Sequence, residues 1–305
     1  MNPAITVKIL QPGDEAALEA FLLPRVDSSM FLIGNMRAAG LADWGQTYQG
    51  SYAAAIESGQ ITGVAAHYWN GNLILQAPAH LERLWPAAVQ ASGRPIRGLV
   101  GPAGQVEAVK MSLGIEPGQV QLDETENLYS LNLAGLVEPE ALRSGRVRGR
   151  RIEPADLEQV IQWRIDYSLE ALGAADTPEL RQSCRASIER SLQEGSTWLL
   201  EEGGRTVACT SFNTAIAEAV QVGGVWTPPE LRGRGYARCV VAASLRDARA
   251  EGVDRAILFT GKHNLPAQKA YLALGFRQIG NYRLLLLNRP ASPDIDSRIK
   301  RNTDE

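Results

Sequence analysis

The feature that most constrains this chain is an arginine- and glycine-rich loop, Leu231–Ala237, between a predicted strand and a predicted helix. The run before it, residues 220–226, is apolar and β-prone, and the run after it, residues 238–245, is rich in small and apolar residues. Glycines let several backbone N–H groups point at one spot, the helix N-terminus adds partial positive charge, and arginines supply paired donors. The sequence therefore predicts a phosphate-binding loop.

The loop differs from two common nucleotide-binding motifs. No Gly-Lys-Ser/Thr follows it, as a Walker A loop would require, and Arg238 stands where a dinucleotide fingerprint needs a third glycine. The loop therefore belongs to neither of those classes.

A second motif lies about thirty residues downstream, after an apolar run at 256–260 that predicts a buried strand. Asn264 suits a helix N-cap, Pro266 the first turn and Gly275 the C-terminal end, so one short helix is predicted. Asn264 and Tyr271 are seven residues apart, or about two turns, and so share one helix face.

In the content, order and spacing of these two motifs the chain resembles the GNAT superfamily of acyl-CoA N-acyltransferases, over roughly residues 147–288. The motifs are Arg232-x-x-Gly235-x-Ala237 and Asn264-x-x-Ala267-x-x-x-Tyr271-x-x-x-Gly275-Phe276. The resemblance implies an α+β fold with a mostly antiparallel, splayed sheet flanked by helices. It also implies that the loop amides bind the pyrophosphate of acetyl-CoA and that a strand bulge opens a gap for the pantetheine arm. We expect that bulge at Gly223-Gly224, inside an otherwise β-branched run.

The resemblance, residue by residue, implies a set of coenzyme contacts. These are Val225, Trp226, Thr227, Arg232, Gly233, Arg234, Gly235, Tyr236, Ala237, Arg238, Asn264, Ala267 and Tyr271. A backbone N–H near Val225 or Trp226 would polarise the thioester carbonyl, and the Tyr271 phenol would give a proton to the leaving thiolate. The simpler alternatives are a core aromatic for Tyr271 and a plain helix cap for Asn264.

The general base is open at this stage. Some family members carry a glutamate on the strand that corresponds to residues 258–260, but here that stretch has no carboxylate. Glu218 is the first candidate and His263 the second. A water relay, or an acceptor amine that is already deprotonated, would need neither residue.

Composition narrows the class of protein. The chain has 305 residues, of which 45% are hydrophobic and 21% charged, and its formal net charge is −3, which argues against general nucleic-acid or membrane binding. The three cysteines are scattered and predict free thiols, with Cys209 and Cys239 in the core. The histidines show no metal-ligand spacing, so no metal site is expected. No run is long enough to span a bilayer, and cytoplasm is the expected compartment.

The first half of the chain resembles the second. Three pairs of segments correspond: Ile9–Asp14 with Arg151–Asp156 (offset 142), Ile56–Ile61 with Glu201–Thr206 (offset 145), and Leu113–Ile115 with Leu274–Phe276 (offset 161). The offset grows by about sixteen residues across the interval that holds the Arg/Gly loop. Lys110 and Ala103 stand where Tyr271 and Asn264 would be. We therefore expect a degenerate repeat without a coenzyme site, with chance similarity of short strings as the alternative.

These patterns predict four segments. They are a degenerate GNAT-like domain at 1–135, a linker at 136–149, a catalytic domain at 150–289 and a loose tail at 290–305. The arginines at the end of the linker are expected to be solvated or, alternatively, to form a basic patch for an anion. Asp166 and Glu170, one helical turn apart, would attract an ammonium group or else lie on a solvated face; Trp163 and Tyr167 are expected in the core.

The leading functional prediction is an N-acetyltransferase that uses acetyl-CoA and a small-molecule or peptide amine, with direct transfer in a ternary complex. One alternative is an acyl-CoA-binding or sensing protein without turnover, to which the missing strand carboxylate gives weight. Another is a tandem-repeat aminoacyl-transferase that uses charged tRNA, against which the intact loop and the acidic net charge argue.

Overall fold

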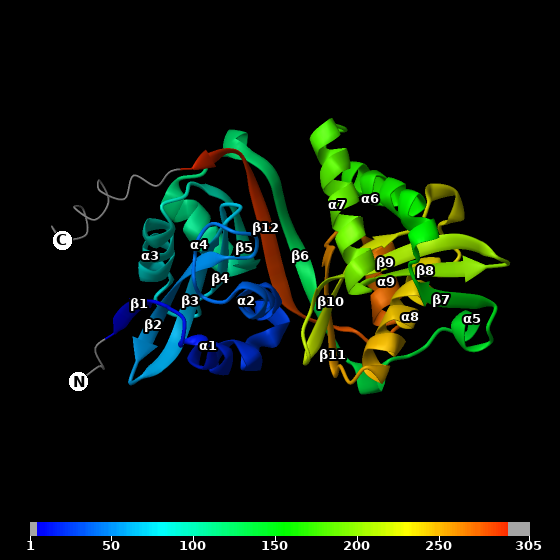
Figure 1. Cartoon of the computed structure of the whole chain (residues 1–305), viewed down its shortest axis with the longest axis horizontal. Coiled ribbons are helices and arrows are strands. Elements are labelled where there is room, and N and C mark those ends of the chain that lie inside the picture. Colours follow the sequence, from blue (N-terminus) through cyan, green and yellow to red (C-terminus); the bar gives the residue numbers. More distant parts are fainter. Residues whose placement is uncertain (1–4, 292–305) are drawn as a thin grey trace. The chain divides into compact units, whose positions relative to one another are not determined.

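The structure, a computed structural model, describes residues 5–291 and divides into two compact units (Figure 1). Unit 1 comprises the chain up to Glu126 together with the chain from Gly280 onward, and unit 2 comprises Asn127–Ile279. The predicted tail at 290–305 lies outside the described residues from 292 on. No helix within residues 5–291 is long and apolar enough to cross a membrane.

Unit 1 is a mixed sheet covered by helices. Its strands are β1 (Thr6–Ile9), β2 (Gly50–Glu57), β3 (Gln60–Tyr68), β4 (Asn72–Gln76), β5 (Ile96–Pro102), and the parts of β6 (Val120–Asn132) and β12 (Arg277–Ala291) that fall in this unit. Its helices are α1 (Glu15–Leu22), α2 (Val26–Ala39), α3 (Leu81–Ser92) and α4 (Ala103–Leu113). In the sheet, strands β1 to β5 lie side by side in chain order and β12 follows β5. Among the described pairs of this unit, β4–β5 is parallel and the others are antiparallel.

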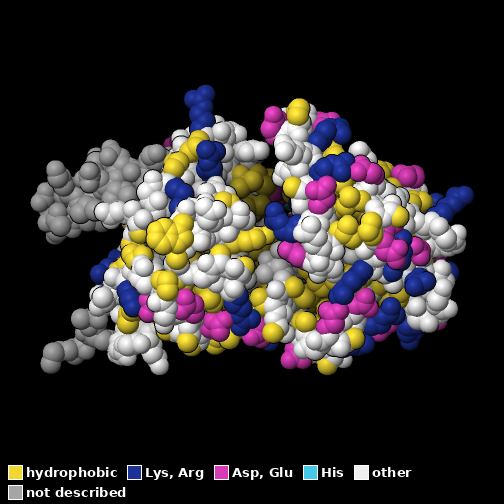
Figure 2. All heavy atoms as spheres, viewed as in Figure 1, with side chains coloured by type: hydrophobic (Ala, Val, Ile, Leu, Met, Phe, Trp, Pro, Cys, Tyr) yellow, Lys and Arg dark blue, Asp and Glu magenta, His cyan; other side chains and the backbone are white. Residues whose placement is uncertain are grey.

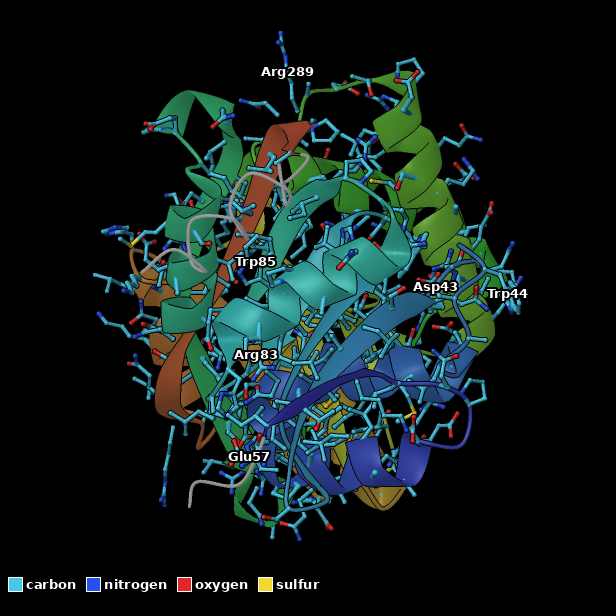
Figure 3. The ribbon with its side chains drawn as sticks, turned by 90° about the vertical axis from the view of Figure 1, so that its left-hand side faces the viewer. Asp43, Trp44, Glu57, Arg83, Trp85 and Arg289 are labelled. Carbon is cyan, nitrogen blue, oxygen red and sulfur yellow. The ribbon has the colours of Figure 1, made fainter. Side chains whose placement is uncertain are left out.

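The core of unit 1 forms where α3 crosses the sheet, as Figure 3 shows from the side of this unit. Leu84 and Trp85 of α3 pack against small alanines of β2 and β3 and against leucines of β4 and β5. Because alanine side chains are short, the helix can approach the strands closely.

Unit 2 repeats this plan. Its strands are β7 (Val147–Arg151), β8 (Thr197–Glu202), β9 (Arg205–Ala215), β10 (Ala219–Trp226) and β11 (Arg255–Gly261), with residues 127–132 of β6. Its helices are α5 (Glu140–Arg143), α6 (Leu157–Ala171), α7 (Pro178–Glu194), α8 (Tyr236–Ala250) and α9 (Leu265–Leu272). The sheet order is β6-β11-β10-β9-β8-β7, and β10–β11 is parallel while β7–β8, β8–β9 and β9–β10 are antiparallel. Short 3₁₀ turns occupy Leu23–Arg25, Pro117–Gln119, Leu133–Gly135, Pro154–Asp156 and Pro229–Leu231.

The two halves have the same order of major elements: strand, two helices, three strands, helix, strand, helix, strand. The tandem arrangement and the α+β fold predicted from the sequence are thus confirmed. Each turn predicted between the paired hairpin strands is also present, between β2 and β3 and between β8 and β9.

The last strand of each half contributes to the other unit. Residues 282–291 of β12 pair with β5, and Leu285 and Leu287 lie in the core of unit 1. Tyr129 and Leu131 of β6 lie in the core of unit 2. The sequence divides the chain into consecutive segments, whereas a sheet is made of whichever strands pair in space. The boundaries 1–135 and 150–289 therefore remain predictions about which segments fold independently.

The sheet of unit 2 is buried on both faces. Tyr236 and Val240 of α8 pack on one face, and residues of α6 and α7 such as Ile161 and Ile188 form a second cluster with Leu199 of β8. Cys209 and Cys239 lie in these two clusters, as predicted.

The predicted bulge in β10 is confirmed. Gly223 pairs with Ser211 and Trp226 pairs with Cys209, so three steps along β10 match two along β9. Gly224 supplies the extra residue and has φ +58°, which only glycine adopts at low cost. Pairing of β10 with β11 ends at Val222–Leu258, and beyond that point the two strands diverge.

Candidate functional site

The Arg/Gly loop connects β10 to α8 as predicted. Gly233 and Gly235 have φ of +78° and +80°, and Gly235 is the N-cap of α8. Since glycine has no side chain, no side-chain cap satisfies the first N–H groups of the helix. Those amides and the positive end of the helix form a surface suited to an anion.

The arginines of the loop differ in what they contact. Arg232 forms an ion pair of 2.8 Å with Glu170 of α6, donates to the Thr227 carbonyl oxygen and lies over the Trp226 ring. Arg234 donates to the Glu230 carbonyl oxygen at 3.5 Å and lies near the Tyr236 hydroxyl. Because Arg232 is already paired, Arg234 carries the less committed positive charge.

Three buried donors or acceptors near the loop have no hydrogen-bond partner within residues 5–291: Trp226 Nε1, Thr227 Oγ1 and Arg238 Nε. Buried polar atoms are satisfied in the great majority of cases, so these three atoms are available to hydrogen-bond a bound ligand or water. Trp226 ends β10, Thr227 follows it directly, and Arg238 lies in the first turn of α8.

Val225 and Trp226 follow the bulge, past the last β10–β11 pair. Their backbone amides lie in the divergent part of the strand, where the sequence predicted an oxyanion donor. Trp226 also packs edge-to-face with Tyr167 of α6, with ring centroids 6.5 Å apart. The bulge therefore aims one end of β10 toward α6.

Tyr236 and Ala237, also predicted to contact the coenzyme, open α8. The Tyr236 side chain is buried and its hydroxyl contacts the Glu202 carboxylate. This hydrogen bond, followed by burial, raises the pKa of Tyr236. The phenol is thus engaged with β8, which leaves the backbone N–H of this residue as its contribution to the loop.

Helix α9 carries the second motif. Asn264 is its N-cap, with Oδ1 accepting from the Ala267 N–H at 3.2 Å. Tyr271 lies on the same helix, buried, with its ring 6.1 Å from that of Phe276. Asn264 therefore performs the capping role that the sequence allowed, and Tyr271 has the aromatic packing that both of its predicted roles require.

The two base candidates lie away from the bulge. Glu218 is in the turn before β10, five residues before Gly223, which corresponds to about 16 Å of strand. His263 is exposed in the turn before α9. The role of Glu218 as base stays a prediction.

The remaining charged candidates are largely paired. Glu170 binds Arg232, and Asp166 accepts from Gln162 Nε2 at 2.8 Å. In the arginine cluster, Arg150 binds Asp156 and Glu201. On the face of unit 2 shown in Figure 2, basic and acidic side chains are interspersed.

Sequence reasoning missed two side chains beside the bulge, Arg164 of α6 and Ser211 of β9. The point where a β-carbon on Gly224 would stand is 3.7 Å from Arg164 Nη1 and 3.6 Å from Ser211 Oγ. No local pattern marks either residue, because helix and strand are joined here only by tertiary packing.

The corresponding part of unit 1 lacks these features. The turn before α3 contains no glycine, its His80 side chain contacts Glu57, and the first helical turn holds Glu82. A β-carbon on Gly101 of β5 would lie 2.9 Å from the Leu75 carbonyl oxygen of β4, so these strands remain close. A β-carbon on Gly261, at the same end of β11, would meet no atom within 4 Å.

No group of three or more His, Cys, Asp or Glu side chains in the described part of the chain could hold a metal ion.

Comparison with known proteins finds a family profile that matches part of the chain and solved structures with a similar fold. Residues 157–276 match the profile of the acetyltransferase (GNAT) family. A search of curated proteins found no match. Among solved structures, a Drosophila melanogaster protein is similar with a TM-score of 0.64 and 12% identity, over 93% of this chain and 99% of that one.

Two further structures cover both units. A GCN5-related N-acetyltransferase from Sphaerobacter thermophilus has a TM-score of 0.57 and 14% identity, over 94% of this chain and 97% of its own. A tandem GNAT protein from the clavulanic acid biosynthesis pathway has a TM-score of 0.55 and 14% identity, over 95% and 100%. At these identities the likeness concerns the fold.

Proposed function

We propose that the chain is an N-acetyltransferase that moves an acetyl group from acetyl-CoA to an amine, because residues 157–276 match the GNAT family profile and the fold resembles that of a tandem GNAT protein. Transfer is direct, in a ternary complex. The acceptor is a small-molecule or peptide amine, and the three cysteines, all free and buried, fit a reducing compartment such as the cytoplasm.

One observation carries this proposal: the unsatisfied atoms of Trp226, Thr227 and Arg238 belong to residues that flank, along the chain, the left-handed glycine loop at the end of a bulged strand. The amides of residues 233–238, with Arg234 and Arg238, would hold the pyrophosphate. Thr227 and Trp226 would bind the polar groups of the coenzyme that follow the pyrophosphate. The remaining predicted contacts are Arg232, Asn264 and Ala267. They would contribute to the site mainly by stabilising the structure around it, Arg232 through its ion pair with Glu170 and Asn264 through its hydrogen bond with Ala267.

The coenzyme supplies an acetyl group activated as a thioester, and the chain supplies the rest. A backbone N–H at Val225 or Trp226 would stabilise negative charge on the acetyl oxygen. Tyr271 would donate its phenolic proton to the departing sulfur. Because no carboxylate lies in the bulge itself, we propose that the acceptor reacts as a neutral amine, with Glu218 at most acting through water.

A second candidate is a protein that binds acyl-CoA without turnover. The distance of Glu218 from the bulge favours it. It differs from the enzyme in one measurable respect, since it would bind acetyl-CoA but release no thiol when pooled amines are added.

Calorimetry on Gly235→Val tests the loop. The valine would strain a backbone at φ +80° and block close approach of a pyrophosphate, so we expect at least tenfold weaker acetyl-CoA binding, or about 1.4 kcal/mol. Gly252→Val is the matched control, because Gly252 has φ +92° and open space around it but lies at the far end of α8. Undiminished affinity in a folded Gly235→Val variant would reject the loop as the coenzyme site.

A further inference from the structure

The guanidinium of Arg164 lies beside the bulge of β10 without a counter-charge. Its Nη1 is 3.7 Å from the β-carbon position of Gly224, and its Cζ is 5.3 Å from the centroid of the Tyr167 ring. Over residues 5–291 this ring is the only side-chain partner found for the group. Arg164 is half-buried, so the group is partly withdrawn from water as well.

Neighbouring arginines of unit 2 are paired. Arg232 binds Glu170, Arg185 binds Glu158 and Arg181 binds Asp176, each through a carboxylate within 2.8 Å. A partly buried positive charge is costly unless an anion compensates it. Arg164 has no such carboxylate within residues 5–291 and is therefore suited to an anion from outside the chain.

No group close to Arg164 supplies that anion. Of the acids on α6, Asp166 accepts from Gln162, Glu170 is held by Arg232, and Glu158 is held by Arg185. Cys209 of β9 lies near enough to feel the charge, but burial raises the pKa of its thiol to about 12, so it stays neutral. Tyr167, a neutral side chain, presents its ring face to Arg164.

A second polar group faces the same point. Ser211 Oγ is 3.6 Å from the β-carbon position of Gly224, and it shares a hydrogen bond of 2.7 Å with Thr197 Oγ1. A guanidinium and a hydroxyl on the same side of Gly224 form a pair of donors that matches the oxygens of a carboxylate. Because glycine has no side chain, no side chain of residue 224 covers these two groups.

We propose that the acceptor is an amine that also carries a carboxylate, of the α-amino acid class, and that Arg164 and Ser211 bind this carboxylate. The inference rests on the proposed function, because it assumes that the acetyl group is presented at Val225 or Trp226. A single carbon separates amine from carboxylate in an α-amino acid. That spacing suits the one-residue step from Gly224 to Val225, about 3.3 Å along a strand.

In the transfer the amine nitrogen forms the bond to the acetyl carbon and the carbon–sulfur bond breaks. The nitrogen gives up one proton to solvent, and the sulfur takes one from Tyr271. The carboxylate is not consumed, so it remains in the product as an N-acetyl amino acid.

Matched acceptors test the proposal. Thiol release from acetyl-CoA is followed with L-amino acids and with their primary amides, which keep the amine and lose the carboxylate. We expect kcat/KM to be at least tenfold higher for the acids. An amide has the less basic amine, which is more deprotonated at neutral pH, so without recognition the preference would reverse.

Arg164→Gln should lower kcat/KM for amino acids by about 10- to 100-fold, as for a lost charge-assisted hydrogen bond, and leave the amides unchanged. Arg164→Lys should retain part of the effect. Acetyl-CoA affinity measured by calorimetry should stay within twofold. Arg185→Gln, which removes a paired arginine from α7, is the control and should match wild type.

Equal use of acids and amides by wild type, or an equal loss on both in Arg164→Gln, would overturn the proposal. Product binding provides a readout without turnover: in the presence of coenzyme A, at least one N-acetyl-L-amino acid of the common twenty should raise Tm in wild type and not in Arg164→Gln. If none does, the proposal is wrong. Failure of acetyl-CoA to bind wild type would instead reject the proposed function itself.

Discussion

Tyr271 is the side chain on which turnover depends most directly in the proposed reaction. Tyr271→Phe keeps the ring that packs 6.1 Å from Phe276 and removes only the hydroxyl. A general acid typically contributes about 10²- to 10⁴-fold, so kcat should fall by about a hundredfold or more while the Kd for acetyl-CoA stays within threefold. Stopped-flow thiol release and calorimetry measure the two quantities. Turnover within about threefold of wild type would make Tyr271 a core residue only.

His67 makes the stability of unit 1 depend on pH. The side chain is fully buried on β3, and burial lowers its pKa from 6.5 to about 4. The folded state therefore keeps the ring neutral while the unfolded state takes up a proton below pH 6.5. This contribution to stability is fully present above pH 6.5 and is lost as pH falls toward 4, by about 2 kcal/mol between pH 7.5 and pH 5.

We accordingly expect the Tm of wild type to drop more between pH 7.5 and pH 5 than the Tm of His67→Gln. His263→Gln, at an exposed position, serves as the control and should follow wild type. The same drop in wild type and His67→Gln would show that other groups govern acid sensitivity.

At the scale of elements, the packing of α8 on β7 depends on one glycine. A β-carbon on Gly149 would lie 2.2 Å from the Ala243 β-carbon, closer than two carbons can approach. Gly149→Ala should therefore push the helix from the sheet and cost about 1–3 kcal/mol in unfolding free energy.

Ala243→Gly removes the atom that the new methyl would strike, at a helix cost of about 1 kcal/mol. The double variant should then be less destabilised than the sum of the two single variants by about 0.5 kcal/mol or more in denaturant unfolding. Ala242→Gly carries the same helix cost without relieving the contact, so its combination with Gly149→Ala should simply add. Additivity in both pairs would contradict close packing at Gly149.

At the scale of the whole molecule, one acetyl-CoA per chain is expected. The turn before α3 has no glycine and no arginine, and β4 and β5 stay in contact where β10 and β11 diverge. Three phosphates need donors or amides that this turn does not offer. Calorimetric stoichiometry near one for wild type, with no site of wild-type affinity left in Gly235→Val, checks this. A stoichiometry of two would refute the degenerate-repeat interpretation.

The exchange of last strands predicts how fragments behave. Residues 136–305 lack Tyr129 and Leu131 of the unit 2 core and carry Leu285 and Leu287 without their β5 partner. This fragment should be poorly soluble, because the unit 2 core side chains that pack against β6 and the apolar side chains of β12 are both left exposed. Residues 127–279 form a matched fragment that retains unit 2, and it should be soluble and bind acetyl-CoA. Equal solubility of the two fragments would argue against the strand assignment.

Local features of unit 2 could be predicted from the sequence alone. The Gly223-Gly224 bulge, the loop that opens α8 and the cap at Asn264 each depend on what a glycine or an asparagine does to the backbone within a few residues. The internal repeat was also visible, since a strand end, a hairpin and a helix end recur in the same order in both halves.

Tertiary structure alone decided which strand joins which sheet and which charges are compensated. Arg232 finds Glu170 across 62 residues, whereas Arg164, on the same helix as Glu170, finds no carboxylate in the described chain. Similarly, β12 pairs with β5 after the chain has built all of unit 2. The physical reason is that ion pairing and strand pairing depend on distance in space, and no pattern of neighbouring residues encodes contacts between segments so far apart in sequence.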